Sequence, residues 1–61
     1  MAEEEGISEE TAQQAELGKQ LLDRGRFQEA AVVLEGVLKQ APKLSYAKNN
    51  LALAYYMNQE P

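Results

Sequence analysis

Residues 17–22 read LGKQLL, and residues 51–56, further along the chain, read LALAYY. When Leu17 is aligned with Leu51, small residues fall on small ones and large apolar residues on large ones, so that Gly18 corresponds to Ala52 and Leu22 to Tyr56. The offset between the two segments is 34 residues (51 − 17). Self-similarity at a fixed offset of this length indicates that the two segments are copies of one structural unit. The rest of the chain is therefore interpreted around these two copies.

The first copy lies in a predicted helix that begins at the N-cap Ser8. Glu9 and Glu10 follow this cap and complement the positive end of the helix dipole. Gly25 is suited to the left-handed conformation that often ends a helix. Between these ends the apolar positions recur at helical spacing, at Ala15, Leu17, Gly18, Leu21 and Leu22.

A second helix is predicted over residues 27–40 and a third over residues 45–58. The second helix has apolar residues three and four positions apart and is closed by Pro42, which cannot continue the helical hydrogen bonds. Strand signals are missing, and the short connections make neighbouring helices antiparallel. The predicted fold is therefore all-α, with three antiparallel helices.

Small residues are expected where the helices cross. Gly18 and Ala30 would let the first and second helices approach closely, and Ala52 would repeat this role in the second copy. The space around the crossing would be filled by four leucines, Leu17, Leu21, Leu34 and Leu38.

The spacing of these residues resembles the tetratricopeptide repeat (TPR) family, whose pattern is Trp-x2-Leu-Gly-x2-Tyr, then Ala-x3-Phe, then Pro, and whose period equals the offset between the two copies. The corresponding residues here are Gln14, Leu17, Gly18, Leu21, Ala30, Leu34 and Pro42. Leucine replaces the family's Tyr and Phe, and Gln14 and Lys48 stand where the family has Trp. The resemblance implies one full helix-turn-helix repeat over residues 11–44 and the first helix of a second repeat over residues 45–58.

Composition restricts the chemistry. The 61 residues include no cysteine and no histidine, which excludes disulfides, a zinc knuckle, a cysteine nucleophile and a histidine base. So short a chain forms one small domain, and this argues against a deep enclosed pocket. We therefore expect no enzyme activity, no cofactor and no metal, and the absence of cysteine fits a cytoplasmic protein.

Charge is unevenly distributed along the chain. The net charge is −4, and five of the ten acidic residues lie in the first ten positions. From Thr11 onward the chain has five acidic and six basic residues. Residues 1–7 are therefore expected to form a disordered acidic leader, and residues 8–61 the TPR-like domain. The absence of a basic cluster or a long apolar run indicates no binding to nucleic acid or membrane.

The resemblance implies a groove, formed by the first and third helices, that holds a peptide or a partner's helix. The expected partner-binding residues are Lys19, Tyr46, Asn49, Asn50, Leu53, Tyr56 and Met57, and the other groove positions of the first helix are Ala12, Ala15, Glu16, Leu22 and Asp23. This predicts a non-catalytic protein–protein interaction module. The alternative for the same side chains is that they pack against each other or against a second copy.

A second apolar stripe on the third helix supports a different function. It consists of Ala47, Leu51, Ala54 and Tyr55, and it is expected to face a fourth helix that the sequence does not contain. The chain would then be a fragment of a longer repeat array or a homo-oligomer. The alternative function is a self-association element whose third helix completes a dimeric helical core.

Overall fold

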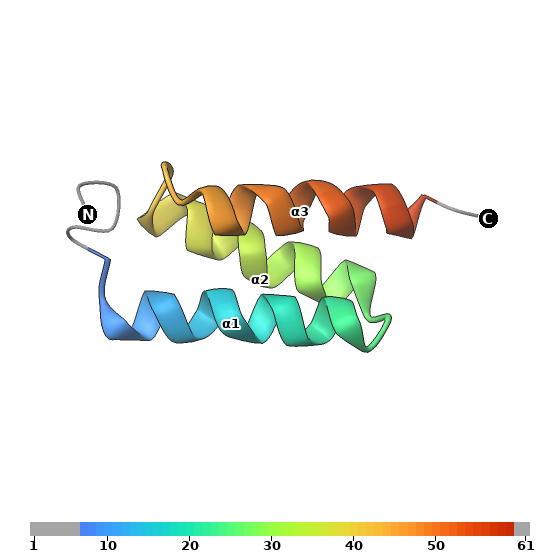
Figure 1. Cartoon of the computed structure of the whole chain (residues 1–61), viewed down its shortest axis with the longest axis horizontal. Helices are drawn as coiled ribbons and strands as arrows, with labels where there is room; N and C mark the ends of the chain where they lie inside the picture. Colours follow the sequence, from blue (N-terminus) through green and yellow to red (C-terminus); the bar gives the residue numbers. More distant parts are fainter. Residues whose placement is uncertain (1–6, 60–61) are drawn as a thin grey trace.

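The computed structural model describes residues 7–59, which form three helices (Figure 1). These are α1 (Glu9–Asp23), α2 (Phe27–Gln40) and α3 (Ser45–Asn58), and no strand occurs among the described residues. The prediction of an all-α fold is confirmed. The leader predicted over residues 1–7 lies outside the described residues except for Ile7. Within residues 7–59 no helix has both the length and the apolar character needed to cross a membrane.

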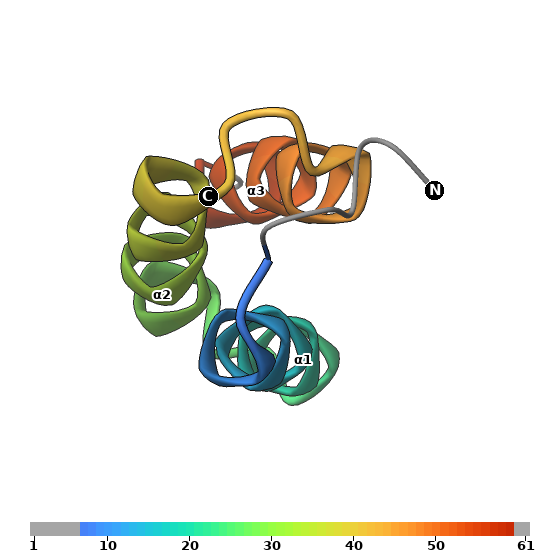
Figure 2. The ribbon, with the colours of Figure 1, turned by 90° about the vertical axis from the view of Figure 1, so that its left-hand side faces the viewer.

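The three helices follow an up-down-up course. α2 runs back along α1, and α3 runs back along α2, so that α1 and α3 point the same way (Figure 1). Seen along the helices, α2 lies to one side and contacts both of the others, while α1 and α3 face each other across an open side (Figure 2). This open side is where a groove was predicted.

Local sequence signals set the helix ends where they were predicted. The Ser8 hydroxyl caps α1 by accepting a hydrogen bond from the Thr11 backbone N–H at 3.0 Å. Gly25, with φ +79°, takes the left-handed conformation in the turn to α2. Pro42 follows directly after Ala41, the C-cap of α2.

The core is built mainly from alanine and leucine. Its buried members are Ala15, Leu22, Ala30, Ala31, Leu34, Val37, Ala47 and Ala54. Small side chains allow close helix contacts, and one such contact is at Gly18, where a Cβ atom would lie only 2.6 Å from the side chain of Leu34. The predicted close crossing of the first two helices is confirmed.

Two residues of the predicted crossing lie elsewhere. Leu17 was expected to fill the core but is exposed, and Ala52 was expected at a second close crossing but is also exposed. Leu51, the counterpart of Leu17, is packed against the core because α2 precedes α3 in the bundle. In the described part of the chain no helix precedes α1 or follows α3, so Leu17 and Ala52 lack the neighbour that would bury them.

Candidate functional site

The side of α3 that borders the open side of the bundle carries Tyr46, Asn50, Leu53 and Met57. We call these four residues the groove face. Their spacings of four, three and four positions align them along one side of a helix. Tyr46 and Leu53 are 41% and 47% exposed, although both are large and apolar. Asn50 and Met57 are half-buried between them and the core.

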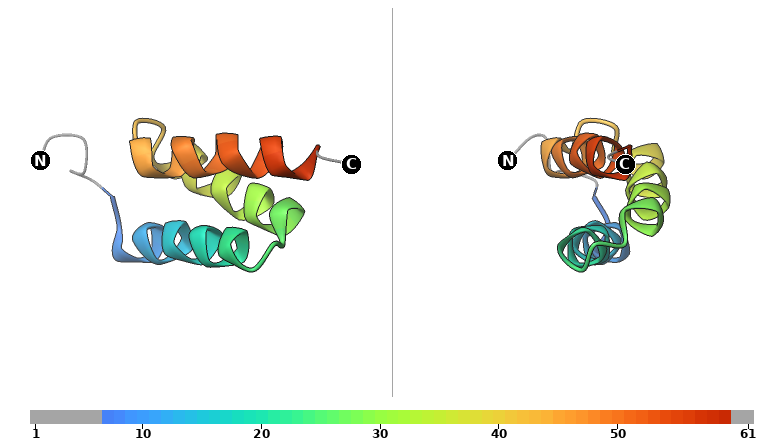
Figure 3. Two further views of the ribbon diagram at one scale, coloured as in Figure 1. Left: turned by 45° about the vertical axis from the view of Figure 1, so that its right-hand side comes forward. Right: turned by 90° about the vertical axis from the view of Figure 1, so that its right-hand side faces the viewer.

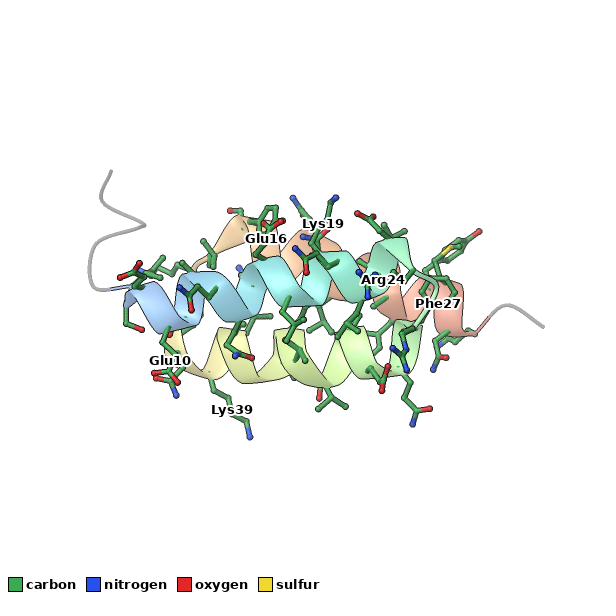
Figure 4. The ribbon with its side chains drawn as sticks, turned by 90° about the horizontal axis from the view of Figure 1, so that it is seen from below. Glu10, Glu16, Lys19, Arg24, Phe27 and Lys39 are labelled. Atoms are coloured by element: carbon green, nitrogen blue, oxygen red, sulfur yellow. The ribbon has the colours of Figure 1, made fainter. Side chains whose placement is uncertain are left out.

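A hydrogen bond links the groove face to α1. The Tyr46 hydroxyl donates to Glu16 Oε1 over 3.4 Å, which is a long bond between exposed groups. One turn further along α1, Lys19 Nζ lies 2.9 Å from Asp23 Oδ2. Glu16 and Lys19 both project from the edge of α1 that faces away from α2 (Figure 4). The predicted residues Lys19, Tyr46 and Asn50 are thus brought to one site.

The pKa values of the site are shifted by these contacts. Partial burial raises the pKa of the Tyr46 phenol, and the negative charge of Glu16 raises it further, while Lys19 and Asn50 act in the opposite direction. The hydrogen bond and charge of Asp23 raise the pKa of Lys19. At neutral pH Tyr46 is therefore a neutral hydrogen-bond donor and Lys19 a cation paired with a carboxylate.

This arrangement suits binding better than proton transfer. Both shifts move the pKa further above neutrality, whereas a general acid or base works best with a pKa near the operating pH. Among residues 7–59 no group of three or more acidic side chains is placed so that it could hold a metal ion. What the described site offers is exposed apolar surface with a few hydrogen-bonding groups.

Asn50 carries the most unusual atom of the site. Its side-chain Nδ2 is buried and has no hydrogen-bond partner of good geometry, even though the residue lies close enough to Tyr46 to influence its pKa. A buried polar group without a partner costs about 1–3 kcal/mol. Because this Nδ2 is inaccessible to solvent, an acceptor on a ligand reaches it only when the Asn50 side chain turns outward, away from Tyr46.

A shallow hollow of about 460 Å³ lies at the end of the groove where α1 and α3 begin. It is lined by Ile7, Ala12, Ala15, Leu44 and Tyr46. Ile7 and Leu44 were not predicted as site residues. Each is an aliphatic residue at the start of a helix, and this position could have indicated them. A residue before the N-cap often packs against the fourth residue of the helix. Ile7 and Ala12 have this relation in α1.

Of the seven predicted partner-binding residues, Lys19 lies on α1, and the structure divides the other six between two faces of α3. Asn49 and Tyr56 are seven positions apart and lie with Ser45 and Ala52 along a side of α3 that is rotated by roughly a quarter of a turn from the groove face. Tyr56 is 62% exposed there. On α1, the groove positions Ala15 and Leu22 are buried in the core, while Ala12, Glu16 and Asp23 are exposed.

The expectation that the stripe Ala47, Leu51, Ala54 and Tyr55 lacks an intramolecular partner is wrong for most of its length. Ala47 and Ala54 are 0% exposed, and Leu51 packs against the same core. Tyr55 is exposed, and its hydroxyl donates a hydrogen bond to Glu35 of α2. The physical reason is that α2 packs between two helices, so α3 uses this stripe to contact the helix before it.

The candidate site consists of three features of α1 and α3. Its elements are the groove face, the Tyr46–Glu16 hydrogen bond and the unsatisfied amide of Asn50. Comparison of the chain with protein-family models, with curated proteins and with solved structures gives no match.

Proposed function

We propose that this chain is a non-catalytic protein–protein interaction module that binds a peptide or a helix in the groove between α1 and α3. The observation that carries the proposal is the groove face, where the exposed side chains of Tyr46 and Leu53 flank the half-buried Asn50. Buried polar groups in folded proteins almost always have partners, and Nδ2 of Asn50 has none. An acceptor on a bound chain would supply the missing partner once the Asn50 side chain turns outward.

The groove face combines the two kinds of contact that protein interfaces use. A partner's apolar side chain would pack on Tyr46 and Leu53, and tyrosine is enriched in such surfaces. A backbone carbonyl of the partner would accept a hydrogen bond from Asn50, and Met57 would adapt to the partner's shape. Lys19 lies at the edge of the groove, where its pairing with Asp23 limits it to orienting the partner.

The internal repeat supports the same function by resemblance. The offset between the two copies and the close Gly18–Leu34 crossing are features of the TPR family, to which we assign the chain as part of this proposal. The absence of cysteine is consistent with the cytoplasm as the proposed location.

The test is selection of peptides from a random library with the full chain as the target. For the selected peptides, Leu53→Ala should weaken binding about tenfold, because it removes a central apolar contact. Asn50→Ala should weaken binding severalfold through the lost hydrogen bond. Tyr56→Ala is the matched control, since it truncates an exposed aromatic side chain of the same helix outside the groove face. Equal binding by all three variants would show that the groove face is not the site.

Self-association through α3 is the second candidate. Four of the six exposed large hydrophobic side chains of the described residues belong to α3, namely Tyr46, Leu53, Tyr55 and Tyr56. Light scattering over a concentration series distinguishes the two functions. A particle of 6.8 kDa at all concentrations supports the peptide-binding module, whereas a dimer that Tyr55→Lys dissociates supports self-association.

A further inference from the structure

We propose that the side of α3 opposite the core is a docking site for an acidic amphipathic α-helix of a partner protein. This outer face consists of Ser45, Asn49, Ala52 and Tyr56, all of which are exposed. The partner helix would run antiparallel to α3 and cover it as α2 covers α1. This inference does not depend on peptide binding in the groove.

The internal repeat identifies the kind of occupant. The residues of α1 that are buried are Thr11, Ala15, Gly18 and Leu22. In the alignment of the two copies they correspond to Ser45, Asn49, Ala52 and Tyr56, so every buried position of α1 has an exposed counterpart in α3. At Gly18 the helix α2 covers this face, and at Ala15 the face also borders Leu44 and Tyr46. The equivalent face of α3 therefore has the residue pattern of a surface that contacts an antiparallel helix.

The contact at Gly18 shows what that helix has to present. Leu34 of α2 lies directly over Gly18 and is 0% exposed. Ala52, the counterpart of Gly18, carries one methyl group more and stands between Asn49 and Tyr56 on the outer face. A partner helix would accordingly place a leucine-sized side chain over Ala52, and the ring of Tyr56 would cover its flank.

Other features of α3 agree with an unoccupied face. Its apolar residues are spread around the helix more evenly than those of α1 or α2, so packing on one side leaves others exposed. Within the described part of the chain no helix lies over the side of α3 that is turned away from α1 and α2 (Figure 3). α1 and α2, by contrast, each place most of their apolar residues toward the core.

Charge favours an acidic partner helix over a second copy of this chain. Residues 43–58 contain Lys43 and Lys48 and no acidic residue. A second copy that paired through its own α3 would bring the same two lysines to the contact, and like charges at an interface are unfavourable. A helix with glutamates flanking its apolar stripe would instead be attracted to this side of the molecule.

The probe for this site is a blocked peptide with the sequence of α2, FQEAAVVLEGVLKQ, which carries two glutamates and one lysine. An isolated helix of this length is marginal in water, so binding is expected only at submillimolar to millimolar peptide. The peptide is titrated into the full ¹⁵N-labelled chain. The largest amide shift changes should fall on Ser45, Asn49, Ala52 and Tyr56.

Matched variants locate the contact. Ala52→Glu should weaken peptide binding at least tenfold, because it places a bulky charge under the apolar stripe of the peptide. Val32→Glu introduces the same charge at an exposed position of α2, away from α3, and should alter the affinity less than about twofold. Both positions are exposed, so both variants should fold, which circular dichroism would verify. Lys48→Glu should weaken binding at low salt and less so at high salt.

Four outcomes would overturn the inference. They are no shift changes at millimolar peptide, shift changes centred on α1 or on the groove face, equal binding by Ala52→Glu and the unmodified chain, and relaxation data showing that a second copy already covers the outer face. None of these outcomes bears on peptide binding in the groove, which should weaken about tenfold in Leu53→Ala and change little in Tyr56→Ala.

Discussion

At Gly18 a single methyl group decides whether α1 and α2 can approach. A Cβ atom there would lie 2.6 Å from the side chain of Leu34, which is fully buried, so that the two helices would have to shift. Gly18→Ala should therefore lower the free energy of unfolding by about 1–3 kcal/mol, as overpacked cores do. Urea unfolding followed by circular dichroism measures this change.

Gly36 is the control for the same substitution. It is also helical, but it is exposed and nothing lies within 4 Å of the Cβ position. Gly36→Ala should raise the free energy of unfolding by about 0.5–1 kcal/mol, because alanine favours the helix more than glycine does. The two substitutions are expected to have opposite signs. If both variants were stabilised, the close contact with Leu34 would be wrong.

Between elements, Tyr46 of α3 is hydrogen-bonded to Glu16 of α1, and its partial burial together with the charge of Glu16 gives a pH dependence. The pKa of Tyr46 is raised from its ordinary value of 10.0, so the folded protein holds the phenol proton more tightly than the unfolded chain does. Lys19, with its pKa raised from 10.5, acts in the same direction. Their contribution to stability is complete below about pH 10 and is lost as the pH rises through the raised values.

An NMR titration of the tyrosine ring signals tests this link directly. The Tyr46 phenol should titrate with a pKa above 10.0, and Glu16→Gln should lower that pKa because it removes both a charge and a charged acceptor. Glu35→Gln is the control, since Glu35 accepts its hydrogen bond from Tyr55 on another side of α3. Equal effects of the two variants on Tyr46 would contradict the pairing seen between α1 and α3.

For the molecule as a whole, stability should be highest in α2. This helix contacts both α1 and α3, whereas α1 and α3 contact each other much less. Opening α2 disrupts both interfaces, while α3 can separate from the bundle and leave the α1–α2 hairpin in place. In native-state hydrogen exchange the slowest amides should be those of α2 around Leu34 and Val37, and slower exchange in α3 would contradict this.

Much of the fold could be predicted from the chain alone because its signals are local. Ser8, Gly25 and Pro42 act through the backbone of their immediate neighbours, so the three helices begin and end close to where the sequence indicates. The crossing at Gly18 was also predictable, since a glycine at helical spacing with leucines marks a close approach. The internal repeat further showed that α1 and α3 are related.

The tertiary structure determines which face of α1 and which face of α3 is covered by α2, and the sequence pattern does not. α1 and α3 share a pattern, yet α2 packs on opposite sides of the two, so Leu22 is buried while its counterpart Tyr56 is exposed. Periodicity shows that a helix has apolar stripes, but the stripe that is buried depends on the position of its neighbours. For that reason Ala47 and Ala54 belong to the core, and Asn49 and Tyr56 lie outside the groove.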